Sequence, residues 1–327
     1  MWSKNKMFAD NSQAEVGEMM ITILMGTYNG AKFIAEQIES ILSQTEKDWK
    51  LIISDDCSTD ATASIVSKYA EAYQDKMTFI VRDKPSGSAK NNFIHMLSLY
   101  ESEYIMTCDQ DDVWLPTKIE LTMKKMREME DKFGKEKPLL VHTDLKIVDA
   151  NLKVMADSMF EYQNLDSGCS ALNNLIVQNI VTGCTMMINR CLLDWIRDVP
   201  EESIMHDWWL AITASAFGHI GFVKEPTVLY RQHSNNEVGA KSAKSLSYNL
   251  QRLMELRKSE LTLRKTYEQA KAFLDIYEQN LSVEQSVMIK AYTSLTTYGK
   301  LKRIYLINKY DFWKIGFARR CGQIFFI

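Results

Sequence analysis

The 327-residue sequence lacks paired cysteines, a long apolar run and a strong net charge. Its six cysteines form no CxxC pair, and most lie in apolar contexts, where a free cysteine packs as a small hydrophobe. No signal peptide opens the chain and no uninterrupted apolar run is long enough to span a bilayer, so we expect a protein of the reducing cytoplasm. The formal net charge of −3 gives no indication of nucleic-acid binding.

Two glycine motifs for phosphate binding are also missing. No G-x-G-x-x-G follows the first apolar run, which excludes the dinucleotide-binding fingerprint, and no G-x-x-x-x-G-K-[ST] is present, which excludes a P-loop. A site that handles phosphate without a glycine cradle must neutralise the phosphate charge in another way. A metal ion held by carboxylates does this.

Most of the first 230 residues alternate short apolar runs with amphipathic helical patterns. Buried strands are predicted, in chain order, at residues 21–25, 50–54, 78–81, 104–108, 139–144, 179–189 and 222–230. Strand–helix alternation with short loops predicts an α/β fold with a mostly parallel central sheet and flanking helices.

The stretch YIMTCDQDDVW at residues 104–114 ends an apolar run in three carboxylates, Asp109, Asp111 and Asp112. Ligands of open α/β sheets bind beyond the carboxyl ends of the strands. Three carboxylates this close repel one another unless a cation compensates them, and Asp109 and Asp111 can both reach one divalent ion. The alternative is an acidic turn that caps the helix beginning near Pro116. We expect one of the three to cap that helix, but a cap does not need three carboxylates.

Two other predicted strands also end in polar residues. Thr27, Tyr28 and Asn29 follow the first strand, and Asp55 and Asp56 follow the second. A helix-capping loop explains any one of these groups alone. Because the carboxyl ends of parallel strands meet at one edge of the sheet, the groups together predict a site there.

Three later positions leave their roles open. Asp207 begins an apolar helix and is either an N-cap residue or, because a histidine and two tryptophans adjoin it, part of a lined pocket. His233 is either an ordinary loop histidine or a ligand of a metal ion or phosphate. Gly183 interrupts its predicted strand, which indicates close approach by a ligand or a neighbouring backbone.

The sequence pattern divides the chain into a loose leader (1–18), an α/β domain (19–240), a helical domain (241–300) and a basic aromatic tail (301–327). The tail holds six basic residues and one acidic residue, against 33 basic and 41 acidic residues in the rest of the chain. Mixed cations and aromatic side chains are typical of single-strand nucleic-acid binding and of interfacial helices on anionic bilayers. A helix docked on the core is the third interpretation. We favour membrane association.

Residues 21–236 resemble the family-2 inverting glycosyltransferases of the GT-A fold. Four motifs carry the resemblance in the order of that family: ILMGTYNG at 23–30, SDDCSTD at 54–60, the DXD motif at 109–111 and HDW at 206–208. The strings DQDDVWLPTK, TGCT at 182–185 and YRQH at 230–233 are most similar to bacterial rhamnosyltransferases, which act on dTDP-L-rhamnose in polysaccharide assembly.

The sequence departs from the family pattern in two ways. Cys57 stands where a glycine commonly follows the paired acids, which is tolerated unless that position needs a positive φ. The Q-x-x-R-W motif of processive synthases is absent, which argues for transfer of a single sugar.

The resemblance implies a role for each candidate residue. Asp207 would be the catalytic general base, and a divalent cation, Mn²⁺ or Mg²⁺, would bind Asp109, Asp111 and His233. The nucleotide would contact Thr27, Tyr28, Asn29, Asp55, Asp56 and Asp109. The donor sugar or the acceptor would contact Asn92, Asp111, Asp112, Trp114, Gly183, Cys184, His206, Trp208 and Arg231.

The resemblance also implies partners: a nucleotide-sugar donor, dTDP-rhamnose first, a glycan or glycolipid acceptor, and the inner leaflet of the membrane through the tail. The protein would lie peripherally at the cytoplasmic face of the cell membrane, would bind no nucleic acid, and is compatible with a homo-oligomer. Alternatives are a UDP-hexose donor on the same fold, a nucleotidyltransferase, and a non-catalytic sugar- or lipid-binding scaffold. The nucleotidyltransferase ranks low because the first loop has no basic residue before Lys32. The scaffold ranks low because every presumed catalytic carboxylate is present.

Overall fold

The computed structural model describes residues 21–196, 199–233 and 251–326. Within them, nine strands form one sheet in the order β3-β2-β1-β4-β8-β6-β9-β5, with β7 paired to β6 beside this path. The strands are β1 (Ile21–Thr27), β2 (Trp49–Asp55), β3 (Met77–Val81), β4 (Tyr104–Cys108), β5 (Val113–Trp114), β6 (Leu139–Val148), β7 (Val154–Ala156), β8 (Met187–Asn189) and β9 (His219–Arg231). Strands β1 to β4 are parallel, as are β6 and β9, whereas β8 runs antiparallel between β4 and β6. The predicted α/β fold with its mostly parallel sheet is confirmed.

Alternating side chains explain why β1 is apolar along most of its length. Ile21, Ile23 and Met25 pack on one face of the sheet, and Leu24 packs on the other. Successive side chains of a strand point to opposite faces, so a strand covered on both sides needs apolar residues throughout.

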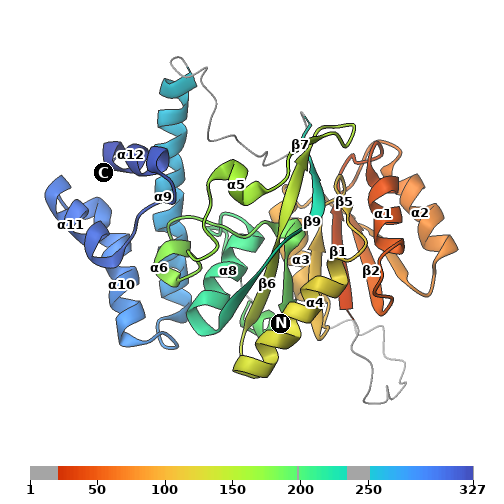
Figure 1. Ribbon diagram of the computed structural model, residues 1–327, viewed down its shortest axis with the longest axis horizontal. Helices are drawn as coiled ribbons and strands as arrows, with labels where there is room; N and C mark the ends of the chain where they lie inside the picture. The colour runs from red at the N-terminus through yellow and green to blue at the C-terminus, as the bar shows by residue number, and fades with distance from the viewer. Residues whose placement is uncertain (1–20, 197–198, 234–250, 327) are drawn as a thin grey trace.

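Helices cover both faces of the sheet (Figure 1). One face carries α1 (Ile34–Leu42), α2 (Thr62–Ala72) and α4 (Lys118–Phe133), and the other carries α3 (Ala89–Leu99), α6 (Leu172–Leu175), α7 (Arg190–Trp195) and α8 (His206–Phe217). The short α5 (Met159–Gln163) packs near β6. This two-sided covering leaves the loops at the strand ends as the place for a site.

The C-terminal helices are α9 (Gln251–Tyr277), α10 (Val283–Thr293), α11 (Lys300–Tyr310) and α12 (Phe317–Phe326), and they stand on the far side of the sheet from α1 and α2 (Figure 1). Apolar residues of α9, α10 and α11 share one core with α8. Trp209 of α8 meets Phe273 of α9 edge to face, with ring centroids 5.4 Å apart. The predicted helical extension is therefore confirmed. Ser282 forms a capping box with Gln285 at the start of α10.

Two sequence-based expectations were wrong in detail. Residues 179–189 are not one strand: a 3₁₀ turn, Gly183–Thr185, precedes the short β8. No carboxylate of the acidic turn caps α4, since its N-cap residue is Thr117, which makes no side-chain cap bond.

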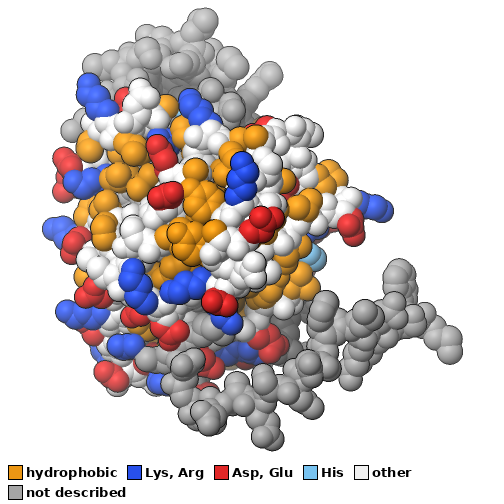
Figure 2. Space-filling model, turned by 90° about the vertical axis from the view of Figure 1, so that its right-hand side faces the viewer, with side chains coloured by type: hydrophobic (Ala, Val, Ile, Leu, Met, Phe, Trp, Pro, Cys, Tyr) orange, Lys and Arg blue, Asp and Glu red, His pale blue; other side chains and the backbone are white. Residues whose placement is uncertain are grey.

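The leader (1–18) and the boundary expected at 240–241 lie outside the described residues, so the division into domains stays a prediction. In the described part of the chain, no helix has both the length and the apolar character needed to cross a bilayer. Figure 2 shows acidic and basic side chains interspersed over the face on the side of α1 and α2, with hydrophobic side chains between them.

Candidate active site

A cleft of about 750 Å³ opens beyond the carboxyl ends of β1 and β4. The chain leaves β1 toward β2 and β3 on one side and returns to β4 on the other, and such a reversal of strand order is where open α/β sheets bind ligands. Of the predicted site residues, the cleft is lined by Thr27, Tyr28, Asp56, Asn92, Asp109, Asp111, Gly183, His206, Asp207 and Trp208. The structure thus gathers residues from four separate sequence motifs.

Asp55 organises the first side of the cleft from within the protein. Its carboxylate is fully buried and accepts hydrogen bonds from the Thr27 hydroxyl (2.8 Å), the Ser58 N–H (2.8 Å) and the Ser58 hydroxyl (2.6 Å). Asn29 fastens the same two loops, because its N–H donates to the Ser58 hydroxyl (2.8 Å) and its side-chain oxygen accepts from the Thr59 N–H (2.8 Å). Both residues stabilise the wall where the sequence predicts the nucleotide, here called the nucleotide-side wall, without lining the cleft themselves.

Asp56 and Asn92 line the cleft from this hydrogen-bonded wall. The Asp56 carboxylate accepts from the N–H (2.6 Å) and hydroxyl (2.8 Å) of Ser86 and pairs with Arg82 at 3.4 Å. The Asn92 side chain exchanges two hydrogen bonds of 2.9 Å with Ser54 at the end of β2. Tyr28, in contrast, is 56% exposed and is available to a ligand.

Cys57 stands where the family pattern commonly has a glycine, and the backbone conformation there shows whether the position needs a positive φ. Its φ is 64°, in the left-handed region that glycine adopts without cost. The position therefore does need a positive φ, and the cysteine is strained there. Its thiol donates to the Arg82 carbonyl at 3.1 Å, which holds the turn in place.

The acidic turn brings Asp109 and Asp111 to the cleft and places His233 beside Asp111. The His233 Nε2 lies 2.8 Å from Asp111 Oδ2, and the imidazole stacks on Phe33 with ring centroids 4.9 Å apart. His233 is thus more than a solvated loop residue. It adjoins one of the two carboxylates that the sequence predicted as metal ligands.

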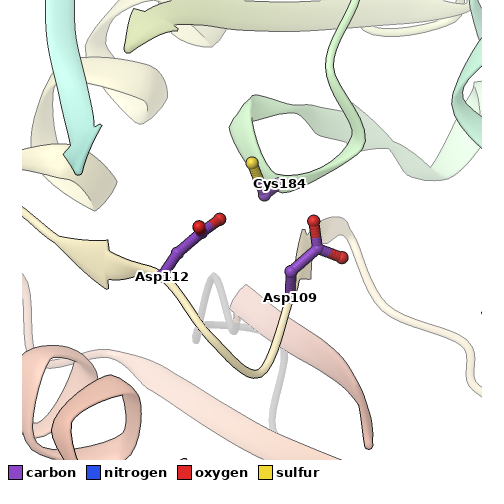
Figure 3. Close-up of side chains that lie close together, drawn as sticks. All are labelled: Asp109, Asp112 and Cys184. Carbon is purple, nitrogen blue, oxygen red and sulfur yellow. The ribbon is translucent and has the colours of Figure 1, made fainter. Parts of the chain in front are cut away.

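A second grouping lies behind this turn, where Asp109, Asp112 and Cys184 bring one ligand atom each within 4.8 Å of the others (Figure 3). Asp112 is fully buried and its Oδ1 accepts the Arg231 N–H at 3.0 Å, whereas Oδ2 has no hydrogen-bond partner among the described residues. Burial raises the pKa of Asp112 well above its usual range, and Asp111 and Asp109 add to this effect. The two carboxylates suit a hard divalent cation, whereas the Cys184 thiol, whose pKa is raised well above its usual range by burial, does not.

Asp207 lines the cleft from the first turn of α8. The N-cap residue is Met205, so capping does not account for Asp207. Burial raises the pKa of Asp207 to about 7, and hydrogen bonds from the N–H groups of Trp208 (2.6 Å) and Gly183 and from the Asn179 side chain oppose this shift. The carboxylate can therefore exchange a proton near neutral pH.

Gly183 and His206 form the wall beside Asp207. A Cβ added to Gly183 would lie 3.0 Å from the His206 Nε2, so the glycine permits the close approach that the sequence indicated. The His206 ring stacks on Phe93 at 4.3 Å, and its burial lowers its pKa to about 3, which keeps the imidazole neutral. The Gly183 carbonyl accepts from the Thr107 hydroxyl at 2.6 Å, which ties this wall to β4.

Four residues expected at the donor sugar or acceptor lie behind the cleft instead: Asp112, Trp114, Cys184 and Arg231. The buried Arg231 guanidinium donates to the carbonyls of Asp111 (2.8 Å) and Ala150 (2.7 Å), pairs with Glu36 and stacks over Phe33. Trp114 is buried, and its backbone N–H donates a hydrogen bond to the Ser40 hydroxyl. None of the four lines the cleft, so their contact with the donor sugar or the acceptor stays a prediction.

Asn179 and Gln110 are among the cleft residues that the sequence analysis did not identify. Asn179 hydrogen-bonds to Asp207, and Gln110, between the two carboxylates of the DXD motif, pairs with the backbone of Tyr28. The position of Gln110 inside the quoted motif was a signal that could have found it. Nothing in the sequence around Asn179 indicates its contact with Asp207, which is far away along the chain.

The chain is similar to known glycosyltransferases. The model of glycosyl transferase family 2 matches residues 22–133. The chain is 28% identical over 222 residues to the dTDP-rhamnosyl transferase RfbG of Shigella flexneri, across 66% of this chain and 74% of that protein. It is 27% identical to the uncharacterized glycosyltransferase RP339 of Rickettsia prowazekii, across 66% of this chain and 64% of that protein.

Among solved structures, the fold is similar to that of S. aureus TarS residues 1–349 in complex with UDP-GlcNAc. The TM-score is 0.51 at 18% sequence identity, over 90% of each chain. An identity this low shows the fold alone, and that fold is the one expected from the motifs. These findings identify the chain as a glycosyltransferase in which residues 22–133 form a family 2 domain on a GT-A fold.

Proposed function

We propose that the protein transfers one sugar, L-rhamnose from dTDP-L-rhamnose, to a saccharide acceptor, with inversion at the anomeric carbon. The observation that carries the reaction type is that Asp207 lines the same cleft as Asp109 and Asp111. The donor assignment is supported by the similarity to a named dTDP-rhamnosyl transferase and by the strings shared with that group. A lipid-linked glycan of cell-surface polysaccharide synthesis is the acceptor class that this similarity favours.

Asp207 acts as the general base in this proposal. Its carboxylate takes the proton of the acceptor hydroxyl as that oxygen attacks the anomeric carbon and the bond to the diphosphate breaks. A carboxylate with a pKa of about 7 is a stronger base than an ordinary aspartate and is still largely ionised in weakly alkaline solution. The hydrogen bond from the Trp208 N–H, at 2.6 Å, holds one oxygen of the carboxylate in place.

Asp109 and Asp111 would hold a divalent cation, Mn²⁺ or Mg²⁺, with His233 beside them. When bound, that ion supplies positive charge to the leaving diphosphate. Tyr28 and Asp56 would contact the nucleoside from the wall that Asp55 and Asn29 stabilise. The apolar side chains of Ile180, Val181 and Ile204 line the same cleft and would exclude water from the sugar.

The C-terminal tail would place the enzyme on an anionic bilayer. Part of the tail docks on the core, since Phe312 is fully buried against Tyr292, with ring centroids 4.9 Å apart. On α12, Phe317 (84%) and Phe325 (70%) remain exposed near the exposed Arg320, a combination that suits a lipid headgroup region.

Thermal stabilisation and transfer assays with a panel of sugar nucleotides, with and without Mn²⁺ or Mg²⁺, test the function. We expect metal-dependent stabilisation by dTDP-L-rhamnose that is lost in Asp109→Ala/Asp111→Ala. Stabilisation by a UDP- or GDP-sugar alone would keep the reaction type and overturn the donor. For the tail, Phe317→Ser/Phe325→Ser should weaken binding to anionic liposomes, whereas Leu261→Ser, an exposed apolar residue of α9, should not.

A further inference from the structure

Gln110, the middle residue of the DXD motif, joins the two loops that border the cleft. Its side-chain oxygen accepts the N–H of Tyr28 at 3.0 Å, and its side-chain N–H donates to the Tyr28 carbonyl at 2.9 Å. The amide therefore makes both hydrogen bonds that a paired strand would make with that residue. The two residues are 82 positions apart in the sequence, so this contact exists only in the folded site.

The backbone pairing explains why such a contact is needed. Strands β1 and β4 run in parallel register up to the pair Met25 and Cys108. Beyond this pair the two segments separate into loops that each carry residues facing the cleft. Gln110 lies two residues after Cys108, and Tyr28 lies three residues after Met25. The Gln110 amide extends the pairing across this gap at the topological switch point.

Gly30 provides the space that Gln110 occupies. A Cβ added to this buried glycine would collide with the side-chain amide of Gln110. The glycine backbone is itself held, because its N–H donates to the Thr62 hydroxyl at 2.8 Å and its carbonyl accepts the N–H of Ile34 at 3.0 Å. Gln110 therefore lies in a slot of fixed shape.

We propose that Gln110 is a positioning residue that locks the nucleotide-side loop at Tyr28 to the acidic turn, so that both halves of the donor site are held as one preformed unit. The inference rests on the proposed function, since it takes Tyr28 as a nucleotide contact and Asp109 and Asp111 as the diphosphate end. Holding both loops before the donor arrives lowers the entropy cost of binding. Loss of Gln110 should therefore weaken donor binding more than it slows the chemical step.

Steady-state kinetics and dTDP binding in the presence of EDTA test this role. Gln110→Ala should raise the donor KM and the metal-free dTDP Kd by about 5- to 30-fold, the effect of losing one or two hydrogen bonds, with a smaller change in kcat. Gln110→Met keeps the length of the side chain without its hydrogen bonds and should match Gln110→Ala. An unchanged KM and Kd, or a loss confined to kcat, would overturn the proposal.

A double-mutant cycle with Gly30 makes the test specific. Gly30→Ala should impair donor binding by displacing the Gln110 amide, and the Gly30→Ala/Gln110→Ala double variant should bind no worse than Gln110→Ala alone, because both changes break one contact. Additive losses would contradict the locking contact. If the wild type turns over no sugar nucleotide, the proposed function fails, and the same cycle is then read from thermal midpoints, where non-additivity still supports the contact between the loops.

Discussion

The two walls of the cleft differ in the interactions that hold their polar side chains. The nucleotide-side wall is a network of short polar side chains around Asp55, Asp56 and Asn92, in which each carboxylate or amide has several partners. The wall formed by Asp207, Gly183 and His206 holds the Asp207 carboxylate among apolar and aromatic residues. Burial is the largest influence on the pKa of Asp207. The first wall fixes shape, and the second sets the chemistry of one group. Changes on the two walls should therefore differ in what they alter.

The largest effect is expected from Asp207→Asn, which removes the base and keeps its size. Transfer should fall by about 10²- to 10⁴-fold, the usual contribution of general base catalysis. The affinity for the sugar nucleotide should stay close to that of the wild type, because Asp207 belongs to the other wall. Kinetics and donor titration on the same preparation check this.

The thermal midpoint of that variant is the control. Burial disfavours the ionised form of Asp207, so the charged carboxylate lowers the stability of the wild type as pH rises from its unfolded pKa of 3.8 toward about 7. Asp207→Asn should therefore not be less stable than the wild type at pH 8. A lower midpoint together with a lost donor affinity would mean that Asp207 is structural.

On the nucleotide-side wall, Asp55→Asn should alter shape rather than chemistry. The new amide NH₂ group faces N–H and hydroxyl donors of Ser58 and Thr27, so a buried acceptor is lost. We expect a loss of about 1–3 kcal/mol in the free energy of unfolding and a raised donor KM. Urea unfolding measures the first effect. A variant with unchanged stability and only a lower kcat would break the contrast between the walls.

The pH dependence of kcat should follow the ionisation of Asp207 and should not depend on residues of the nucleotide-side wall. Because the base must be ionised, the rate should rise with pH and level off above a pKa of about 7. Asn179→Ala removes a hydrogen bond that lowers this pKa, so the rising limb should move to higher pH. Asp56→Asn, on the other wall, should leave the position of that limb unchanged.

The smallest effect concerns Cys57, which is strained on the nucleotide-side wall at a φ of 64°. Cys57→Gly should raise the free energy of unfolding by about 0.5–1 kcal/mol, since relief of the left-handed strain exceeds the entropy cost of glycine. Cys57→Ala keeps the strain and removes the thiol bond to Arg82, so it should lower stability. Equal stability of both variants would show that φ is not the cause.

The local sequence was sufficient for β1, β2 and β4, because a fully buried strand leaves an unbroken apolar run followed by polar loop residues. It also located Asp109, Asp111 and Asp207, which stand at the starts or ends of such elements. It did not distinguish residues that face the cleft from those behind it: Asp111 and Asp112 are neighbours, yet only Asp111 lines the cleft. That distinction depends on Arg231, 119 residues from Asp112, whose N–H holds the Asp112 carboxylate inside the protein.

The contact between α9 and α8 has a consequence for truncated and chimeric forms of this enzyme. Gln269 of α9 accepts the N–H of Ile204, just ahead of Asp207, at 2.8 Å, and Phe273 packs on Trp209 directly behind it. Helix α9 is therefore part of the scaffold that positions Asp207, the proposed base, and is not a detachable anchor. A chimera that exchanges this region for the tail of a relative would inherit a differently supported base, and a surface that captures the exposed side chains of α12 would hold the whole catalytic cleft at a fixed angle to itself.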